Sequence, residues 1–374
     1  MDFELSEERQ MLKDTAERFI REQYPIEKRH AATKSDTGYD PEMWTSFCEL
    51  GLAGALVSAD AGGFGGTGED IALVFEALGR GIVVEPFLPT LLATTVLAET
   101  GRTELVESAM EGQVQLAFAH SEPNAYYTPT HVEVTAQDEG GWLLSGRKSV
   151  VINGATADHL IVTARVAGDV ATSDGLGLFL VDRTADGVSV DDHQSIDGPH
   201  VAEITFEGAR AEALGSPGQD WPLIEKALSA GALAVSAEAL GAMDVAKDMT
   251  VDYLKERKQF GKAIGANQVL QHRMVDMLLE LEQARSAVML AANSFEADRD
   301  TRELNVSAAK NLVGRAGRLI AEESIQMHGG VAMTWEWPLP HYSKRIIMID
   351  HLFGDVDHHL ERFIEIGKKI EHGG

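Results

Sequence analysis

Three short motifs in the second half of the chain combine residue types that suit a dinucleotide. Residues 257–261 read Arg-Lys-Gln-Phe-Gly, Gln268 lies eleven residues after Arg257, and residues 326–330 read Gln-Met-His-Gly-Gly. An arginine offers a planar fork of donors that matches a pyrophosphate. Glutamine amides can bond ribose or adenine, and a glycine pair lets the backbone approach closely. Together the motifs predict a site for the anionic linker of a dinucleotide.

The composition is that of an ordinary globular protein with a strongly acidic surface. The chain has 374 residues, 44% of them hydrophobic and 24% charged, with a formal net charge of -27. Such acidity argues against nucleic acid and against an anionic bilayer. The single cysteine, Cys48, cannot form an internal disulfide, which fits a reducing, cytoplasmic compartment. The first residues lack the pattern of a signal peptide, and we expect no membrane span.

The elements that must position these motifs change character twice along the chain. Residues 1–112 predict helices, residues 113–213 a β-domain, and residues 214–374 a helical bundle. The β-domain is expected from short runs rich in β-branched residues, at 114–119, 131–136, 142–144, 159–164, 178–182 and 201–206. The bundle is expected from helical spacing at 223–257, 267–297, 304–328 and 356–370. The fold class is therefore mainly α with a central β-domain.

A glycine-rich segment, 62–66, interrupts the first helical region. It invites comparison with a phosphate-binding loop, but no Gly-Lys-Ser/Thr follows it and no clear strand precedes it. We interpret it as a flexible connection.

The motifs resemble the acyl-CoA dehydrogenase family, and so do residues 69–80, 141–148 and 153–155. The resemblance implies an N-terminal helical domain, a middle β-barrel or sandwich, and a C-terminal four-helix bundle. It implies FAD as cofactor and a tetramer built as a dimer of dimers, in which the motifs hold the adenine end of a neighbour's FAD. The residues matched are Arg257, Phe260, Gln268, Gln326, Gly329 and Gly330.

The side of the family's site that meets the flavin ring is altered. A Thr-Glu-Pro followed by Gly-Ser-Asp is usual, but this chain has Ser121 in Ser-Glu-Pro and lacks the Gly-Ser-Asp. The family's Lys-x-Trp-Ile-Thr-Asn-Gly is Lys-Ser-Val-Val-Ile-Asn-Gly here, so Val150 replaces the tryptophan and Ile152 the threonine. A valine provides area without an aromatic quadrupole. We expect a ring pocket that includes Ser121, Val150 and Ile152.

The family's catalytic base is missing from both places that the resemblance indicates. Dehydrogenation of an acyl-CoA needs a carboxylate to take the α-proton while a hydride leaves for the flavin. One usual position falls on Phe353 and the other on Gly231, neither of which can accept a proton. The nearest substitutes are Asp355 and Glu238. His351 and the adjacent histidines at 358–359 have poor spacing for a metal, and we predict no metal site.

Three functions stay open at this point. The chain could be the base-lacking subunit of a heteromeric acyl-CoA dehydrogenase, similar to small subunits of bacterial enzymes such as pimeloyl-CoA dehydrogenase. It could be a self-sufficient homotetramer with a displaced base, or a non-catalytic FAD-binding assembly subunit. The resemblance further implies an acyl-CoA substrate, a role in fatty acid metabolism and an electron-transferring flavoprotein as acceptor.

Overall fold

The computed structural model describes residues 5–372, and the chain divides into two compact units. The helical unit is built from the chain up to Glu27, from Thr67–Val83 and from Ala232 onward. The barrel unit consists of Lys28–Gly66 and Val84–Gly231. The predicted architecture of helices before and after a central β-domain is confirmed.

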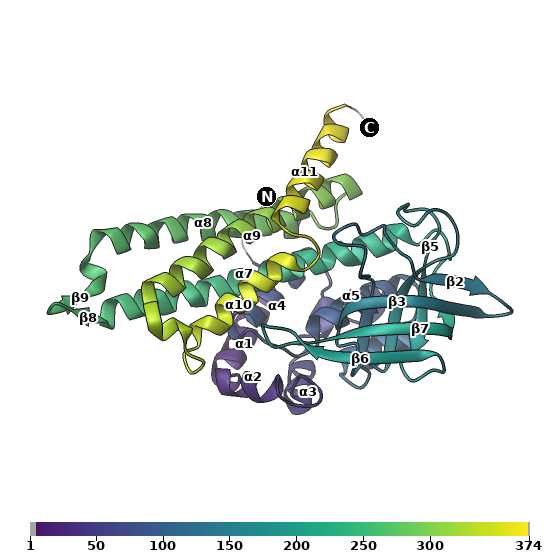
Figure 1. Ribbon diagram of the computed structural model, residues 1–374, viewed down its shortest axis with the longest axis horizontal. Helices are drawn as coiled ribbons and strands as arrows, with labels where there is room; N and C mark the ends of the chain where they lie inside the picture. Colours follow the sequence, from purple (N-terminus) through teal and green to yellow (C-terminus); the bar gives the residue numbers. More distant parts are fainter. Residues whose placement is uncertain (1–4, 373–374) are drawn as a thin grey trace. The chain divides into compact units, whose positions relative to one another are not determined.

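The barrel unit is organised around a closed ring of strands. The strands are β1 (Leu116–Ala119), β2 (Thr135–Asp138), β3 (Trp142–Ile152), β4 (His159–Arg165), β5 (Leu176–Asp182), β6 (Val188–Gln194) and β7 (His200–Ala213). Strands β4, β2, β3, β7 and β5 pair in turn, and β5 pairs back with β4, so the sheet closes on itself (Figure 1). Strand β1 adds to β4 in parallel, and β6 adds to β7. Alternate side chains fill the interior, among them Leu144, Val162, Phe179, Ile204 and Phe206.

Short helices complete the barrel unit. They are α3 (Pro41–Glu49), α5 (Phe87–Glu99) and α6 (Thr103–Met110), with 3-10 turns at Gly54–Leu56 and Ala59–Ala61, while α2 (Ile26–Ala32) lies at the boundary of the two units. Trp44 and Phe47 of α3 meet Phe87 edge to face, with ring centroids 5.0 and 5.2 Å apart. These aromatic contacts join α3 to α5.

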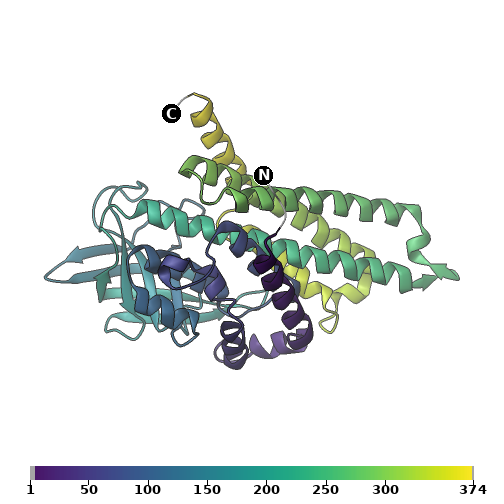
Figure 2. The ribbon, with the colours of Figure 1, turned by 180° about the vertical axis from the view of Figure 1, so that it is seen from behind.

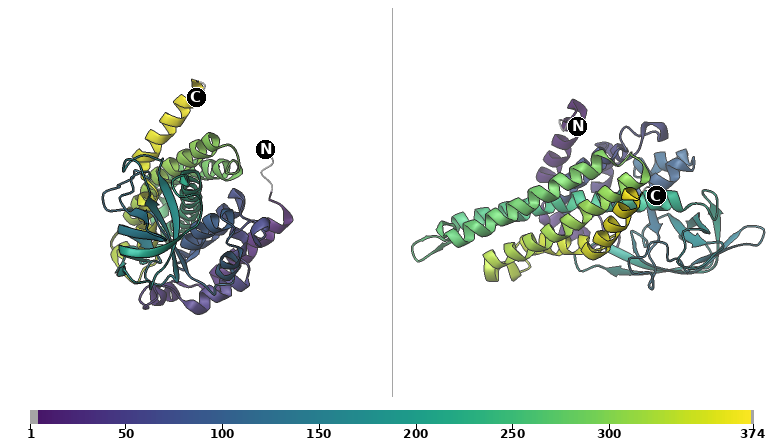
Figure 3. Two further views of the ribbon diagram at one scale, coloured as in Figure 1. Left: turned by 90° about the vertical axis from the view of Figure 1, so that its right-hand side faces the viewer. Right: turned by 90° about the horizontal axis from the view of Figure 1, so that it is seen from above.

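The helical unit contains the long helices that carry the motifs. Its elements are α1 (Glu7–Gln23), α4 (Gly68–Gly81), the hairpin of β8 (Lys258–Gln259) and β9 (Lys262–Ala263), 3-10 turns at Ile264–Ala266 and Gly329–Met333, and α8 (Gln268–Asn293), α9 (Arg299–His328), α10 (Leu339–His351) and α11 (Val356–Glu371). Helices α8 and α9 run side by side, seen from above in Figure 3, and α1 packs on α4, seen from behind in Figure 2. Helix α11 packs against α9, and its C-terminal part projects past the other helices (Figure 1).

Charged contacts tie α4, α7 (Trp221–Glu256) and α8 together. The Arg285 guanidinium contacts the carboxylates of Glu76 at 2.6 Å and Asp244 at 2.7 Å. Arg80 also reaches Asp244, at 3.2 Å. Arg285 therefore links carboxylates from two other helices, which fixes the register of all three.

Helix α7 crosses from one unit into the other as a continuous element. It is long and apolar enough to cross a membrane by length and composition, but 83% of its most apolar window is buried inside the protein. Its alanine-rich middle therefore acts as the core of a packed fold.

The predicted helices are confirmed, with shifted ends and one omission. The third predicted helix, 304–328, begins earlier, as α9 at Arg299, because the Asp298 side chain accepts a hydrogen bond from the Thr301 N–H at 3.1 Å and caps it. The second ends at Asn293 rather than near residue 297. Helix α10 was not predicted, because the prolines at its start and the preceding turn hide its periodicity.

The strand predictions differ from the structure in the lengths of β3 and β7, which run on to Ile152 and Ala213, and in two further places. The run at 131–136 was expected to be a strand, but β2 begins only at Thr135. The N–H groups of Glu133 and Val134 instead donate to the carboxylate of Glu122, which takes the place of a neighbouring strand. Strand β6 was missed because it is polar and mostly exposed, and it pairs only with β7.

The glycine-rich segment is a tightly packed turn, so its interpretation as a flexible connection was wrong. The N–H of Gly65 donates to the carbonyl of Val57 at 3.0 Å, and that of Gly66 donates to Ala55 at 2.9 Å. A Cβ on Gly65 would lie 2.1 Å from the Ala55 carbonyl oxygen. Glycine is required there because two backbone segments meet without room for a side chain.

Candidate FAD and acyl-CoA site

The arginine motif forms a tight hairpin at the end of α7. Helix α7 ends at Glu256, Arg257 follows, and β8 and β9 enclose a two-residue loop of Phe260 and Gly261. Both loop residues have positive φ, 52° and 82°, as a two-residue hairpin of this twist requires. The Phe260 side chain is 100% exposed. The hairpin therefore presents an arginine and an uncovered aromatic ring together.

The second glutamine motif lies beside this hairpin. The ring of Tyr253, one turn before Arg257, stacks on His328 at the end of α9, with centroids 4.4 Å apart. That contact holds the α9 end, with Gln326, against the end of α7. Because α8 begins just after the hairpin, Gln268 belongs to the same end of the helical unit. The structure thus gathers the three motifs that the sequence analysis combined.

The residues of this region suit the phosphates and ribose of FAD. Arg257, Gln268 and Gln326 are exposed, and Arg257 makes no ion pair within residues 5–372. A Cβ on Gly329 or Gly330 would meet nothing within 4 Å, so backbone at the end of α9 is open to a ligand. An uncommitted guanidinium, two amides and an open backbone are the donors that a pyrophosphate and a ribose require.

The residues predicted to meet the flavin ring lie together in the barrel unit. The carbonyl of Ser121 accepts a hydrogen bond from the N–H of Ser149 at 2.8 Å, which places Ser121 next to the end of β3. The β3–β7 register is irregular between Lys148 and Val151, and within this bulge Val150 has φ 53° and is 52% exposed. Ile152, at the end of the strand, is partly buried. The bulge turns Val150 out of the barrel.

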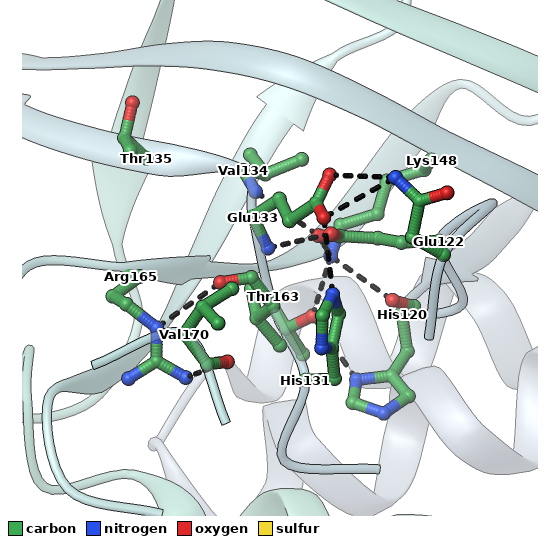
Figure 4. Close-up of polar contacts among 12 residues, drawn as sticks. His120, Glu122, His131, Glu133, Val134, Thr135, Lys148, Thr163, Arg165 and Val170 are labelled. Carbon is green, nitrogen blue, oxygen red and sulfur yellow. Dashed lines mark hydrogen bonds and ion pairs between the residues drawn. The ribbon is translucent and has the colours of Figure 1, made fainter. Parts of the chain in front are cut away.

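A buried ammonium group underlies this edge of the barrel, as Figure 4 shows. Lys148 is 0% exposed, and its Nζ donates to Glu122 Oε1 at 2.7 Å, Thr163 Oγ1 at 2.9 Å and the His120 carbonyl at 3.0 Å. Burial lowers the pKa of Lys148 to about 8, although the Glu122 carboxylate opposes that shift. The ion pair joins β3 and β4 to the connection after β1, which carries Ser121.

The hydrogen bonds around Lys148 extend to His120. Thr163 Oγ1 accepts from Lys148 at 2.9 Å and lies 3.1 Å from His120 Nδ1. His120 also forms a hydrogen bond with the backbone of Pro129. Burial and then the Lys148 charge lower the pKa of His120 to about 3, so the imidazole is neutral at physiological pH.

Arg165 fixes the far part of the same connection. Its guanidinium donates to backbone carbonyls at 2.9 to 3.0 Å, those of Thr130, Val132, Val170, Thr172 and Asp174 (Figure 4 shows Arg165 and Val170). Lys148 and Arg165 thus hold the two ends of the long connection between β1 and β2. The connection that carries Ser121, a candidate cofactor contact, is therefore fixed by side-chain hydrogen bonds at both ends.

Neither expected base position offers a proton acceptor. Phe353 lies in the turn between α10 and α11 with φ 59°, and its side chain is partly buried. Gly231 lies within buried α7.

The two substitute carboxylates are already engaged. Both oxygens of Glu238 contact the Arg345 guanidinium, at 2.6 and 2.7 Å, and Glu238 is only 4% exposed. Asp355 caps α11, since its Oδ1 accepts from the His358 N–H at 2.9 Å. This geometry disfavours both as general bases, because each would lose a structural partner on taking a proton.

Left-handed backbone marks three of the predicted site residues. Six non-glycine residues among those described have positive φ, and Val150, Phe260 and Phe353 are three of them. Such conformations cost roughly 1–3 kcal/mol each and cluster at functional sites. The coincidence supports the assignment of these three positions on grounds independent of the motifs.

Comparison with known proteins identifies the family. The models for the N-terminal, middle and C-terminal domains of acyl-CoA dehydrogenases match residues 6–112, 117–209 and 218–362. Acyl-CoA dehydrogenase IpdE2 of Mycolicibacterium smegmatis is 30% identical over 359 residues, which cover 96% of this chain and 98% of that protein. The chain belongs to the acyl-CoA dehydrogenase family. The predicted class, an oxidoreductase acting on acyl-CoA with FAD as cofactor, is confirmed.

Solved structures agree over the whole chain. A variant of the Tcur3481-Tcur3483 steroid acyl-CoA dehydrogenase has a TM-score of 0.89 at 27% identity, and the match covers 98% of this chain and 99% of that one. PigA with FAD and proline also has a TM-score of 0.89, at 26% identity, and the match covers all of both chains.

Sequence reasoning missed two parts of the site. The Glu122–Lys148 pair lay inside motifs that we had quoted for other residues. Its local sequence carried no clear signal, because only part of β3 is buried and the neighbours of Lys148, Arg147 and Ser149, are polar. The ion pair of Glu238 with Arg345 could not be anticipated without α10.

Proposed function

We propose that this chain is the base-lacking subunit of a heteromeric acyl-CoA dehydrogenase. The observation that carries the proposal is the absence of an available carboxylate at the expected positions. Phe353 and Gly231 cannot accept a proton, Glu238 is paired with Arg345, and Asp355 caps a helix. The α-proton of an acyl-CoA thioester must then go to a carboxylate of another chain.

The division between the two sides of the site supports this role. The adenine-side donors Arg257, Gln268 and Gln326 are kept and exposed, while the ring side has Val150 in place of an aromatic residue. In the heteromer, this chain's Arg257 would neutralise the pyrophosphate of FAD and its glutamines would bond the ribose or adenine. The bound flavin would supply the acceptor for the hydride of the β-carbon. The carboxylate that takes the α-proton lies on the other subunit.

Uncovered apolar side chains support an assembly. Exposed hydrophobic residues of the helical unit occur on α8, at Val269, Val275, Leu278, Leu279, Met289 and Leu290, and on α11, at Leu360, Phe363, Ile364 and Ile370. Those at 360, 363 and 364 follow helical spacing, so they lie on one face of α11. Such clusters mark surfaces that another chain covers. The similarity to a steroid enzyme named for two proteins, Tcur3481 and Tcur3483, agrees with a two-chain assembly.

The substrate proposed is an acyl-CoA with a bulky acyl group, and the proposed acceptor is an electron-transferring flavoprotein. The first part rests on the likeness to the steroid enzyme at 27% identity. The second rests on family membership. A homotetramer with a displaced base and a non-catalytic assembly subunit are the competing functions, and the experiment below separates all three.

The test is to purify the chain alone, record its visible spectrum and assay acyl-CoA oxidation with a dye acceptor. We expect bound or bindable FAD but no turnover, with turnover appearing when a homologue that carries the base is co-expressed. Robust turnover by the chain alone would contradict the proposal, and its loss in Asp355→Asn or Glu238→Gln would favour a displaced base. A chain that neither contains nor takes up FAD would favour the assembly subunit.

A further inference from the structure

The turn between α10 and α11 has a backbone that needs external support. Residue 353 has φ 59° and Gly354 has φ 106°. For phenylalanine the left-handed region is unfavourable by roughly 1–2 kcal/mol, because Cβ crowds the next carbonyl. A turn whose sole task was to connect two helices would be more stable with glycine at both positions.

A buried lysine provides the first support. Lys310 of α9 is 0% exposed, and its Nζ donates to the carbonyls of Gly354 at 2.8 Å and Asp350 at 3.0 Å. Within residues 5–372 it forms hydrogen bonds to these two backbone carbonyls and no ion pair, while the carboxylates of Asp350 and Asp355 favour its charged form from a longer distance. Burying such a charge is costly, and it is expected only where the conformation it fixes is needed.

Two side chains support the turn from the other side. His359 Nε2 donates to the Phe353 carbonyl at 2.9 Å, and Asn311 Nδ2 donates to the Val356 carbonyl at 2.9 Å. His359 is 4% exposed, and its Nδ1 has no hydrogen-bond partner in the described part of the chain. The bond to the Phe353 carbonyl is therefore the hydrogen bond that this buried imidazole makes there. The carbonyls from 353 to 354 are therefore held by side chains of two helices.

Space around the turn is equally restricted. A Cβ on Gly354 would lie 2.3 Å from His358 Cδ2 and 3.0 Å from His359 Nε2. A Cβ on Gly314 of α9 would lie 2.2 Å from Asp350 Oδ1. The backbone of the turn is therefore closely confined on the sides of Gly354 and Gly314.

We propose that Lys310 and His359 are positioning residues: they hold the backbone carbonyls of the turn, and so fix the direction in which the side chain of residue 353 leaves it, toward the acyl group of the substrate. This inference rests on the proposed function, which places residue 353 at the acyl-CoA site. In this chain residue 353 is a phenylalanine, whose ring would limit the size and shape of the acyl group that fits the site. Lys310 and His359 touch no substrate and act through the turn.

The experiment places a single fluorine at residue 353. Site-specific incorporation of 4-fluorophenylalanine at 353 in the full chain, loaded with FAD, gives a fluorine NMR line that reports the environment of that ring. We expect one line in the parent protein, and a shift of that line on addition of the CoA thioester of a steroid acid, a bulky acyl-CoA of the proposed class. In Lys310→Met we expect two or more lines or a broadened one, and in Lys310→Arg a single line again, because arginine still donates to carbonyls.

His359 supplies a second test with no change in charge. We expect His359→Leu to broaden or split the line and His359→Gln, whose amide can donate, to preserve it. Since this pair leaves Lys310 in place, it keeps the test valid if Lys310→Met does not fold. Circular dichroism and thermal melting establish which variants are folded.

The results separate the two proposals. An unchanged single line in folded Lys310→Met and His359→Leu would overturn the positioning role, and so would a line that the steroid acyl-CoA fails to shift in FAD-loaded protein. The base-lacking role is judged separately, by turnover of the chain alone. Turnover with fluorine results as expected would refute that role and leave the positioning residues standing.

Discussion

The buried pair of Lys148 and Glu122 predicts a large stability loss on removal of one partner. Lys148→Met removes an ammonium that donates to a carboxylate, a hydroxyl and a carbonyl at 2.7 to 3.0 Å. Glu122 would keep its backbone donors at Glu133 and Val134, but its buried charge would lose its ion-pair partner, with only Arg165 acting on it from a longer distance. Breaking such a pair costs about 3–5 kcal/mol, which is a large share of the roughly 5–15 kcal/mol that stabilises a domain.

The assay is urea unfolding at pH 7, in which circular dichroism and tryptophan fluorescence report the unfolded fraction. The matched control is Thr163→Val, which removes one neutral hydrogen bond of the same cluster and should cost about 1 kcal/mol. Adding Glu122→Gln to Lys148→Met should recover roughly 2 kcal/mol, because the unpaired charge is then gone. If Lys148→Met costs no more than Thr163→Val, the ion pair does not stabilise the barrel edge and our reasoning about it is wrong.

Four further predictions address backbone strain, packing, the substitute base and pH. Val150→Asn should raise the free energy of unfolding by about 1 kcal/mol, since asparagine tolerates the left-handed conformation; an unchanged urea midpoint would show that the bulge is relaxed. Gly65→Ala should lower it by about 1–3 kcal/mol through the clash with the Ala55 carbonyl, whereas Gly367→Ala, an open helical site, should raise it by about 0.5–1 kcal/mol. Glu238→Gln should cost roughly 3 kcal/mol yet leave unchanged the rate of flavin reduction by acyl-CoA in the co-expressed complex, measured by stopped flow; loss of reduction in folded complex would instead identify it as the base. Burial lowers the pKa of His359 to about 2 in the folded chain, below the 6.5 of an exposed histidine, so below pH 6.5 the unfolded chain takes up a proton that the folded chain does not. The free energy of unfolding should therefore fall by up to about 1.4 kcal/mol per pH unit below pH 6.5. In urea titrations from pH 7.5 to 5, His359→Gln should remove this contribution to the pH dependence.

Much of the fold, and the grouping of the three motifs at one end of the helical unit, could be predicted from local patterns. The long helices followed from the spacing of apolar residues, and the C-terminal end of α9 from a glycine. Arg257, Gln268 and the 326–330 motif could be grouped because each lies at a helix end, where a hairpin or a glycine leaves donors exposed. These signals are encoded within a few residues of sequence.

The parts that could not be predicted depend on contacts between distant segments. Glu122 was read only as part of a motif, because its partner Lys148 and the backbone of Glu133 and Val134 meet it through the closed sheet. Glu238 stayed a candidate base until Arg345 of the unpredicted α10 was placed beside it. The packed turn at 62–66 resembled a flexible loop, since composition does not show that two backbones touch.

The left-handed residues Val150 and Phe353 have a consequence for protein engineering. At both places the main chain is bent into a costly shape and held there by groups from other elements, whatever side chain it carries. Reinstalling an aromatic ring at 150 or a carboxylate at 353 would therefore require new side chains on an existing frame, with no loop redesign. The chain is a scaffold on which the chemistry of a complete dehydrogenase can be rebuilt one substitution at a time, and each addition can be measured against the same backbone.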